Sequence, residues 1–177
     1  MIINNTFLEK AKSLEPVLFK KEVLPSNTVK LIKDCSLRLG WRAIPYGSIE
    51  ELYEKTFSQD DEVVIDFGEH LVGYLNLQYD TVDSHADSPM RLKLTFGELP
   101  CDTAIPPESF EGLLGRSWLQ TEIVTVDIIP GKITLPRRYA FRYMKMKIEG
   151  MSPYYKVRFP KVSVTAVTSA DESKLES

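Results

Sequence analysis

The sequence has few of the cysteine and histidine residues that crosslink a small protein or bind a metal ion. Its 177 residues include two histidines and two cysteines, Cys35 and Cys101. Two cysteines do not form a disulfide framework in a chain this long. They could pair, but we expect two separate buried thiols and a reducing compartment. Neither stands in a Cys-x-x-Cys motif or near a pair of histidines, so no zinc site is expected.

Long apolar runs and targeting signals are also missing. No stretch approaches the roughly 18 apolar residues that a membrane-spanning helix needs, and the N-terminus lacks a basic region followed by an apolar run. We therefore expect no membrane span, no signal peptide and a cytoplasmic location. The net charge of −3 gives no electrostatic reason for binding nucleic acid or an anionic membrane.

Familiar catalytic motifs are absent as well: there is no nucleophile elbow, no His-Glu-x-x-His and no phosphate-binding glycine loop. What is present is a composition of 43% hydrophobic and 27% charged residues, typical of a globular domain with a real core. Two capping boxes, Thr6-Phe-Leu-Glu9 and Ser48-Ile-Glu-Glu51, precede apolar residues at helical spacing. They predict short helices over residues 7–14 and 49–57.

Apolar and polar residues alternate through much of the remaining sequence, which is the period of a β-strand. Many strands, spaced turns and few helices predict a mainly β fold: an antiparallel β-sandwich of jelly-roll (galactose-binding-like) type with two short helices. The predicted strands cover residues 17–23, 29–33, 36–44, 62–67, 71–79, 90–96, 121–129, 132–135, 141–149 and 156–168.

The pattern divides the chain into three parts. Residues 1–60 hold the two predicted helices and are expected to complete the sandwich. Residues 61–169 form its core, and residues 170–177 form a polar, flexible tail. Two loops, residues 81–89 and 100–117, are long for a compact domain, and such loops are often functional.

The first long loop holds Asp83, His85 and Asp87 and follows Asp80. Their spacing does not match an EF-hand, which needs acidic ligands at fixed offsets around a central glycine. A solvated acidic turn is the favoured interpretation and a calcium site the alternative. No other cofactor is expected.

The second long loop is surrounded by carboxylates, Glu98 and Asp102 among them, and leads to Trp118. Two carboxylates can hydrolyse a glycosidic bond, but no spacing rule selects a pair, so we expect no catalytic residue. An aromatic plate suits the apolar face of a sugar ring. For Trp41 and Trp118 a packing role is nevertheless favoured, with Trp118 the better sugar-stacking candidate.

Residues 132–161 contain nine lysine or arginine residues and a single acid, Glu149. A nucleic-acid stripe is one interpretation of this bias. Lys145 and Lys147, however, share one phase of a strand while apolar residues occupy the other. This alternation favours a solvated strand face over an apolar one.

Arg142 is the exception, because it lies on the apolar phase of its strand. A buried guanidinium needs a carboxylate partner. Asp66 and Glu98 also share a phase with apolar residues of their own strands. We therefore expect Arg142 to pair with Glu98 or Asp66 in a structural polar cluster.

Three segments, taken in order, carry a resemblance to a known family. Asp66-Phe-Gly68 is followed by Gly73, then Gly97-Glu98 ends a strand, and after a long loop and another strand comes Phe141-Arg142-Tyr143. In this order and spacing the chain resembles the β-sandwich domain that precedes the catalytic barrel in bacterial α-L-rhamnosidases of glycoside hydrolase family 78. The resemblance covers residues 62–169, and residues 1–60 match less clearly.

In such enzymes the catalytic acid and base lie in a downstream (α/α)₆ barrel, and hydrolysis inverts the anomeric centre. The resemblance implies a non-catalytic accessory domain whose partner is the barrel, which it packs against and whose entrance it shapes. Some family members use a related sandwich as a calcium-dependent rhamnose-binding module. Acidic residues in the loop after the Glu hold the sugar there, and Asp102 is the nearest equivalent here.

Two other functions stay open. The chain could be a carbohydrate-binding module for L-rhamnose or a related sugar of a rhamnose-containing glycan, with its site near Glu98, Asp102 and Trp118. It could also be an unrelated interaction domain of jelly-roll type. If the sandwich was excised from an enzyme, we expect an exposed apolar patch where the barrel docked.

Overall fold

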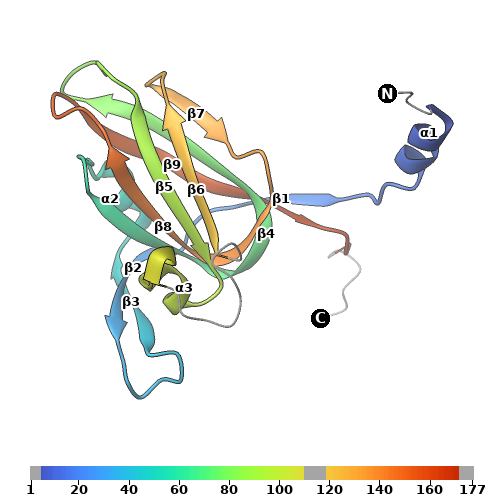
Figure 1. The fold of residues 1–177 in the computed structure, drawn as a ribbon, viewed down its shortest axis with the longest axis horizontal. Helices are drawn as coiled ribbons and strands as arrows, with labels where there is room; N and C mark the ends of the chain where they lie inside the picture. Colours follow the sequence, from blue (N-terminus) through green and yellow to red (C-terminus); the bar gives the residue numbers. More distant parts are fainter. Residues whose placement is uncertain (1–4, 110–118, 172–177) are drawn as a thin grey trace.

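The computed structural model describes residues 5–109 and 119–171. In these ranges, nine antiparallel strands are joined in one hydrogen-bonded network, in the order β1-β9-β4-β8-β5-β6, with β2, β3 and β7 branching from it (Figure 1). The strands are β1 (Phe19–Val23), β2 (Asn27–Lys33), β3 (Trp41–Gly47), β4 (Glu62–Val82), β5 (Met90–Gly97), β6 (Gln120–Val126), β7 (Gly131–Thr134), β8 (Tyr139–Gly150) and β9 (Lys156–Thr168). This confirms the predicted mainly β, antiparallel sandwich.

Strand β4 divides the network into two layers. Residues 64–66 of β4 lie between β2 and β8, whereas residues 76–78 lie between β9 and β7. Where β4 passes from one layer to the other, its register with β8 breaks between Asp66 and Leu71, and Gly68 adopts a φ of +84°. Such a bulge bends a strand. Two strands were predicted here, and the structure has one bent strand instead.

The core lies between the two layers. Along β5 the residues Met90, Leu92, Leu94 and Phe96 are all buried, as the alternation predicts. Phe96 of β5 stacks on Tyr139 of β8, with ring centroids 4.2 Å apart, and meets Phe141 edge-on at 4.9 Å. Fully buried side chains come from both layers and include Ile65, Leu75, Leu94, Phe141 and Val164.

Helices lie at the periphery: α1 (Asn5–Ser13), α2 (Ile49–Glu54), α3 (Pro100–Ala104) and the 3₁₀ helix η1 (Pro107–Ser109). The first two were predicted, although α1 includes Thr6, which was expected to cap it; the two in the second long loop were not predicted. Helix α2 ends earlier than expected because Phe57 forms a β-bridge with Val157. Within the described ranges no helix is long and apolar enough to cross a membrane.

The hairpin of β2 and β3 differs from the prediction. Residues 36–44 were expected to be a strand, but β3 runs from Trp41 to Gly47. Asp34 organises the turn, since its carboxylate accepts hydrogen bonds from Ser36 and Arg42. Cys35 stands in this turn and is exposed, not buried as expected, because the turn projects from the sandwich (Figure 1).

The strand predicted over residues 121–129 ends at Val126. Of the tail expected over residues 170–177, the part from residue 172 lies outside the described residues.

Candidate functional site

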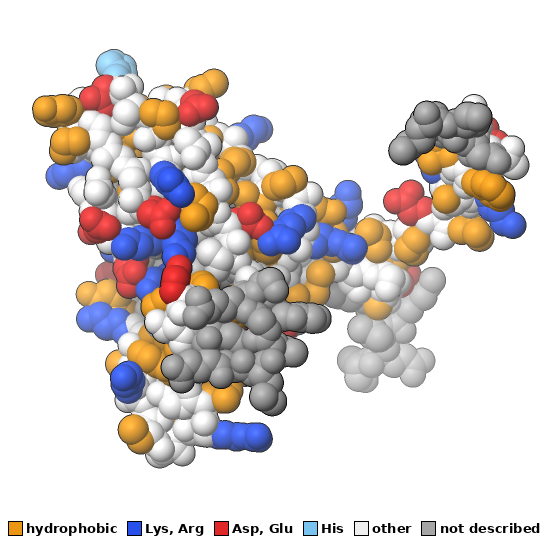
Figure 2. Space-filling model, viewed as in Figure 1, with side chains coloured by type: hydrophobic (Ala, Val, Ile, Leu, Met, Phe, Trp, Pro, Cys, Tyr) orange, Lys and Arg blue, Asp and Glu red, His pale blue; other side chains and the backbone are white. Residues whose placement is uncertain are grey.

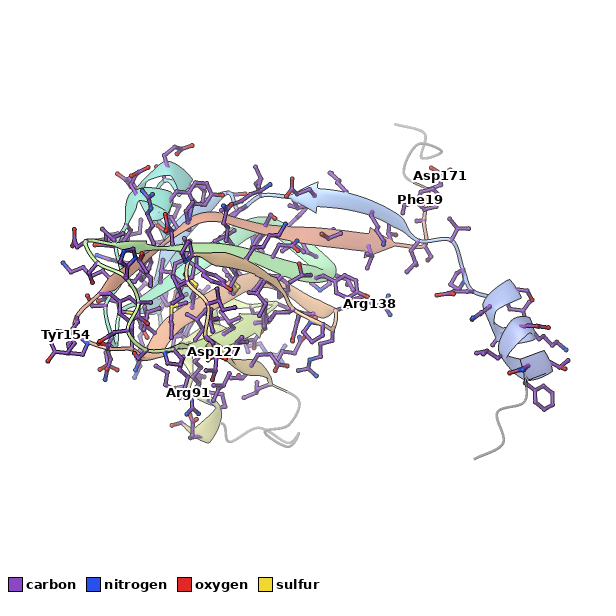
Figure 3. All side chains as sticks on the ribbon, turned by 90° about the horizontal axis from the view of Figure 1, so that it is seen from above. Phe19, Arg91, Asp127, Arg138, Tyr154 and Asp171 are labelled. Atoms are coloured by element: carbon purple, nitrogen blue, oxygen red, sulfur yellow. The ribbon has the colours of Figure 1, made fainter. Side chains whose placement is uncertain are left out.

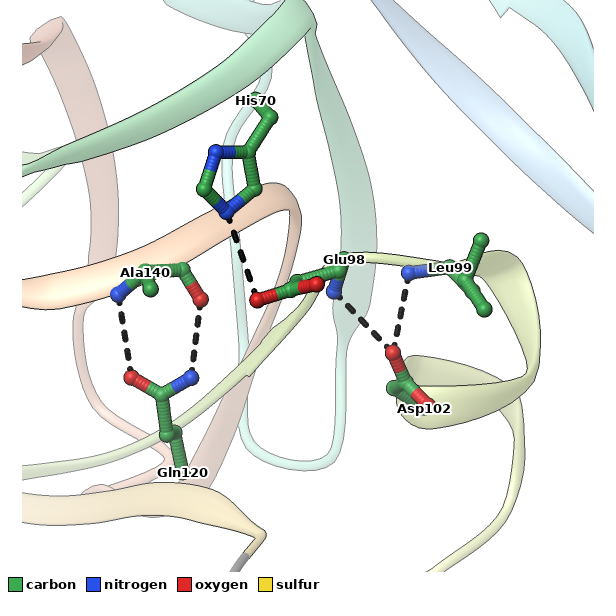
Figure 4. A network of polar contacts seen from close by, with 6 residues as sticks. All are labelled: His70, Glu98, Leu99, Asp102, Gln120 and Ala140. Atoms are coloured by element: carbon green, nitrogen blue, oxygen red, sulfur yellow. Dashed lines mark hydrogen bonds and ion pairs between the residues drawn. The ribbon is translucent and has the colours of Figure 1, made fainter.

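The candidate carboxylates lie where β5 leaves the sheet. Helix α3 begins at Pro100, in the first turn, where a backbone N–H would have no helical partner. Asp102 turns back, and its Oδ2 accepts hydrogen bonds from the backbone N–H groups of Glu98 at 3.0 Å and Leu99 at 2.9 Å (Figure 4). Both hydrogen bonds that this oxygen accepts therefore come from the protein backbone. Asp102 therefore fixes the reversal between β5 and α3.

Glu98 lies on the surface beside the bulge of β4. Its side chain is 59% exposed, and its Oε1 lies 3.3 Å from Nε2 of His70 (Figure 4). The expected place of Glu98 in a buried cluster with Arg142 is wrong. The phase argument failed because β5 ends at Gly97, so the strand alternation does not extend to Glu98.

Arg142 pairs with Asp66, the other carboxylate that the sequence offered. Arg142 Nε donates to Asp66 Oδ1 at 2.8 Å, and Nη2 donates to Oδ2 at 2.9 Å. Asp66 is 6% exposed and also accepts a hydrogen bond from the backbone N–H of Gly68 at 2.7 Å. Hydrogen bonding to Asp66 raises the pKa of Arg142. The pair ties β4 to β8 at the bulge.

At the same end of the sandwich, a second side chain is hydrogen-bonded to the backbone. Gln120 of β6 accepts a hydrogen bond from the backbone N–H of Ala140 at 3.1 Å and donates one to its carbonyl at 2.8 Å (Figure 4). The side chain thereby replaces a strand pairing, since β6 is adjacent to β5 and not to β8. These contacts are structural, because both polar atoms of the Gln120 side chain bind the backbone of Ala140.

Sequence reasoning missed both His70 and Gln120. For His70 a signal existed: the strand pattern breaks between residues 67 and 71 at a glycine followed by two polar residues, which indicates a bulge. For Gln120 we find no sequence signal. Asp102 at the third position after Leu99, with Pro100 between them, could have predicted the start of α3.

The predicted carbohydrate site is brought together only in part. Asp102 and Glu98 are joined through the backbone of Glu98, whereas Trp118 lies outside the described residues. Trp41 is half-buried in the hairpin, with Nζ of Lys33 5.9 Å from its ring centroid.

Cys101 precedes Asp102 in α3. Burial, reinforced by Asp102, raises the pKa of the Cys101 thiol to about 11.

In and beside the acidic loop between β4 and β5, Asp80 and Asp87 make ordinary contacts with other side chains. Asp80 forms an ion pair with Arg158 at 3.2 Å, and Asp87 accepts a hydrogen bond from the hydroxyl of Ser152 at 3.1 Å. Over residues 5–109 and 119–171, no group of three or more His, Cys, Asp and Glu side chains is placed to hold a metal ion.

A hollow of about 250 Å³ lies on the outer face of β5 and β8, beside residues 105–107. Lys93 and Lys147 stand directly opposite each other there, an arrangement that destabilises a sheet unless acids compensate it. Acids do so, and the two signs mix on the face in Figure 2. The ion pairs are Lys93–Glu108 at 3.3 Å, Lys145–Glu62 at 2.9 Å and Lys147–Asp60 at 3.3 Å.

Lys93, Lys145 and Lys147 lie on the outer side of the sheet, whereas Met144 and Met146 on the opposite phase of β8 are buried. This agrees with the predicted strand that has a polar face and an apolar face. The charges of the polar face are neutralised in place, and this does not favour a phosphate-binding stripe.

The comparison with protein families decides where the chain belongs. The model of the glycosyl hydrolase family 78 alpha-rhamnosidase N-terminal domain matches residues 25–166. The chain belongs to this family. The match begins well before residue 62, where the resemblance in the sequence became clear, and so includes β2, β3 and α2 in the family 78 domain.

A solved structure supports the assignment. The chain is 38% identical to a rhamnosidase from Klebsiella oxytoca with rhamnose bound, with a TM-score of 0.85. The similarity covers 93% of this chain and 32% of that protein. The family 78 domain thus spans about a third of the length of the Klebsiella enzyme.

A more distant similarity is to the GH78 family rhamnosidase of Bacillus sp. GL1. It has 15% identity and a TM-score of 0.49, covers 73% of this chain and 13% of that one, and is too weak to support an argument. No curated protein sequence matches the chain.

The motif that carried the resemblance in the sequence has a structural meaning in this domain. Asp66 and Arg142, its charged members in β4 and β8, bind each other, and Glu98 closes β5 beside His70 on the same bulge. The motif therefore marks the bent end of a scaffold.

Proposed function

We propose that this chain is the non-catalytic accessory domain of a multidomain α-L-rhamnosidase, in which it packs against the catalytic barrel and shapes its entrance. The observation that carries the proposal is the 38% identity to the Klebsiella rhamnosidase over 93% of this chain, which is only 32% of that protein. The greater part of such an enzyme lies outside the matched domain.

The geometry at the motif supports a scaffold role. Asp102 and Gln120 are hydrogen-bonded to backbone groups, and Asp66 is bonded to Arg142. A catalytic carboxylate must instead reach a substrate proton or the anomeric carbon. Asp66 and Asp102 direct their oxygens into the fold, which does not favour intrinsic hydrolysis.

Removing the domain from the product of the complete gene tests this role. We expect deletion of residues 5–171 to shorten the half-life of rhamnosidase activity at raised temperature by at least about tenfold, because the barrel loses a packed neighbour. Gly73→Ala should have a similar effect, since a Cβ there would lie 2.4 Å from the Thr165 carbonyl, whereas Gly150→Ala should not. An unchanged half-life after deletion would refute the proposal.

The alternative, a module that itself binds L-rhamnose or a related sugar, is supported by one observation: the Glu98 side chain is 59% exposed and accessible to a ligand. Titration of the domain with millimolar L-rhamnose, with and without calcium, separates the two functions. Saturable heat or chemical-shift changes would favour the module, and calcium dependence would add the metal. A cytoplasmic location stays a prediction that cell fractionation would test.

A further inference from the structure

The N-terminal arm, defined as residues 5–19, is the least packed part of the described structure. Helix α1 has no buried residue, and it stands away from the sandwich (Figure 1). Leu8 is 47% exposed, Leu14 72% and Val17 76%. Figure 2 shows hydrophobic and charged side chains together along the arm, which stands apart from the sandwich.

The arm has the pattern of a helix that is covered on one side. Leu8, Ala11 and Leu14 recur at three-residue spacing, which keeps them on one side of the helix. A helix of nine residues is marginal in water, because so short a segment gains little from propagation after its costly nucleation. A stable α1 therefore needs a neighbour for its apolar face.

The root of the arm lies beside the point where the chain leaves the sandwich. Phe19 of β1 is paired with Thr168 of β9. Phe19 and Asp171, the last described residue, lie close together in Figure 3. Both line a groove of about 510 Å³, whose wall combines apolar Leu71, Val72 and Ala166 with the polar side chains of Lys20, Lys21, Glu69 and His70. The last described residue therefore lies at this groove.

We infer that the arm and this groove, together, form the surface on which the catalytic part of the same polypeptide docks. The inference rests on the function proposed above. The matched domain is 32% of the Klebsiella rhamnosidase, so a large further part exists in that enzyme. Asp171 itself lines the groove, so we expect a part that follows it in the sequence to contact the groove and the arm.

A second copy of the chain is the competing occupant, because β1 is an edge strand that an identical strand could extend. Its outer edge carries Lys20 and Lys21, both exposed, and edge lysines are a usual defence against such pairing. Dependence on protein concentration separates the two occupants, since docking within one polypeptide is independent of concentration.

Amide hydrogen exchange on the product of the complete gene tests the inference. We expect residues 5–19 to exchange at least about tenfold more slowly than an unstructured peptide of the same sequence, equally at low and high protein concentration. Exchange at the unstructured rate would overturn the inference. Protection that disappears on dilution would overturn it in favour of a second copy.

Paired variants identify the contact. Leu14→Ser with Val17→Ser should abolish the protection of the arm, because both side chains are docked. These residues are mostly exposed within the sandwich domain, so its folding is not at risk. The control is Tyr154→Ser, which is 79% exposed and lies at the opposite end of the molecule (Figure 3). Equal protection in the double variant and the control would also overturn the inference.

The two proposals fail in different ways. If deletion of the domain shortens the half-life of the enzyme but the arm exchanges freely, only the docking surface is wrong. If the complete gene encodes no catalytic part, both are wrong.

Discussion

Arg142 holds Asp66 through two parallel hydrogen bonds, from Nε at 2.8 Å and from Nη2 at 2.9 Å, at the place where β4 and β8 lose register. Asp66 also fixes the backbone of Gly68. The pair thus secures the bulge that lets one strand serve both layers of the sandwich.

We predict that Arg142→Ala lowers the free energy of unfolding by about 2 kcal/mol, because it leaves a buried carboxylate with less compensation. The figure is below that for a fully buried pair, since the Arg142 side chain is 39% exposed. Urea denaturation measures the change. The control is Arg91→Ala, which breaks the Glu149 pair at a 56% exposed arginine and should lose less than about 1 kcal/mol. Equal losses would contradict the structural role of Arg142.

Gly73→Ala should destabilise the sandwich by roughly 3 kcal/mol or prevent folding. An added Cβ would lie 2.4 Å from the Thr165 carbonyl oxygen and 2.8 Å from Cα of Ala166, both backbone atoms that cannot move aside cheaply. Thermal unfolding followed by circular dichroism measures the effect. In the matched variant Gly150→Ala the nearest atom lies at an ordinary 3.6 Å, and a similar loss there would show that the close strand approach is not the cause.

Asp102→Ala should lower the free energy of unfolding by about 1 kcal/mol, the usual effect of removing a helix-capping side chain. Two backbone N–H groups, of Glu98 and Leu99, lose their acceptor. Asp127→Ala, at an exposed position, is the control and should stay within about 0.5 kcal/mol. If Asp102→Ala leaves stability unchanged but abolishes a sugar-binding signal, Asp102 is a ligand residue instead of a cap.

Cys101 should be alkylated by iodoacetamide roughly a hundredfold more slowly than Cys35 at neutral pH, because the thiolate is the nucleophile. Burial raises the pKa of Cys101 to about 11, whereas Cys35 is exposed. Mass spectrometry of partly alkylated peptides gives both rates. In denaturant the two rates should converge. Equal rates in the folded protein would show that α3 does not shield Cys101.

Buried tyrosines should make the domain sensitive to alkali. Burial is the main cause that raises the pKa of five tyrosines above 10.0, namely Tyr53, Tyr79, Tyr139, Tyr143 and Tyr155. Above this pH the unfolded chain releases protons that the folded protein retains, so the free energy of unfolding falls as pH rises through the folded pKa values. Urea midpoints from about pH 8 to about pH 11 measure the trend. Constant midpoints would contradict it.

Much of the fold could be predicted because strand alternation and capping boxes are local signals. The alternation from Met90 to Phe96 marks a strand with one buried face, and the capping box from Ser48 to Glu51 marks the start of α2. The bent strand β4 was not recognised, since its unity depends on pairing with β8 and β9 on either side of a bulge. The exposed position of Cys35 likewise depends on how far the hairpin projects.

The polar contacts could be predicted only where the strand phase holds. Asp66 is buried in mid-strand, and its need for a basic partner could be predicted. The expectation that Arg142 is buried too is wrong, because its side chain is 39% exposed and lies between the buried Phe141 and Tyr143. Glu98 lies one residue beyond its strand, where alternation no longer determines which way a side chain points, and it faces His70 instead. Gln120 contacts a strand that is not its neighbour in the sheet, and no local pattern encodes such a contact.

We propose above all that this chain is the non-catalytic part of a rhamnosidase. Hydrolysis of p-nitrophenyl α-L-rhamnopyranoside, measured side by side for the product of the complete gene and for residues 1–177 alone, tests it most directly. We predict turnover by the complete product and none above the uncatalysed rate by residues 1–177. Turnover by residues 1–177, or none by the complete product, would contradict the account.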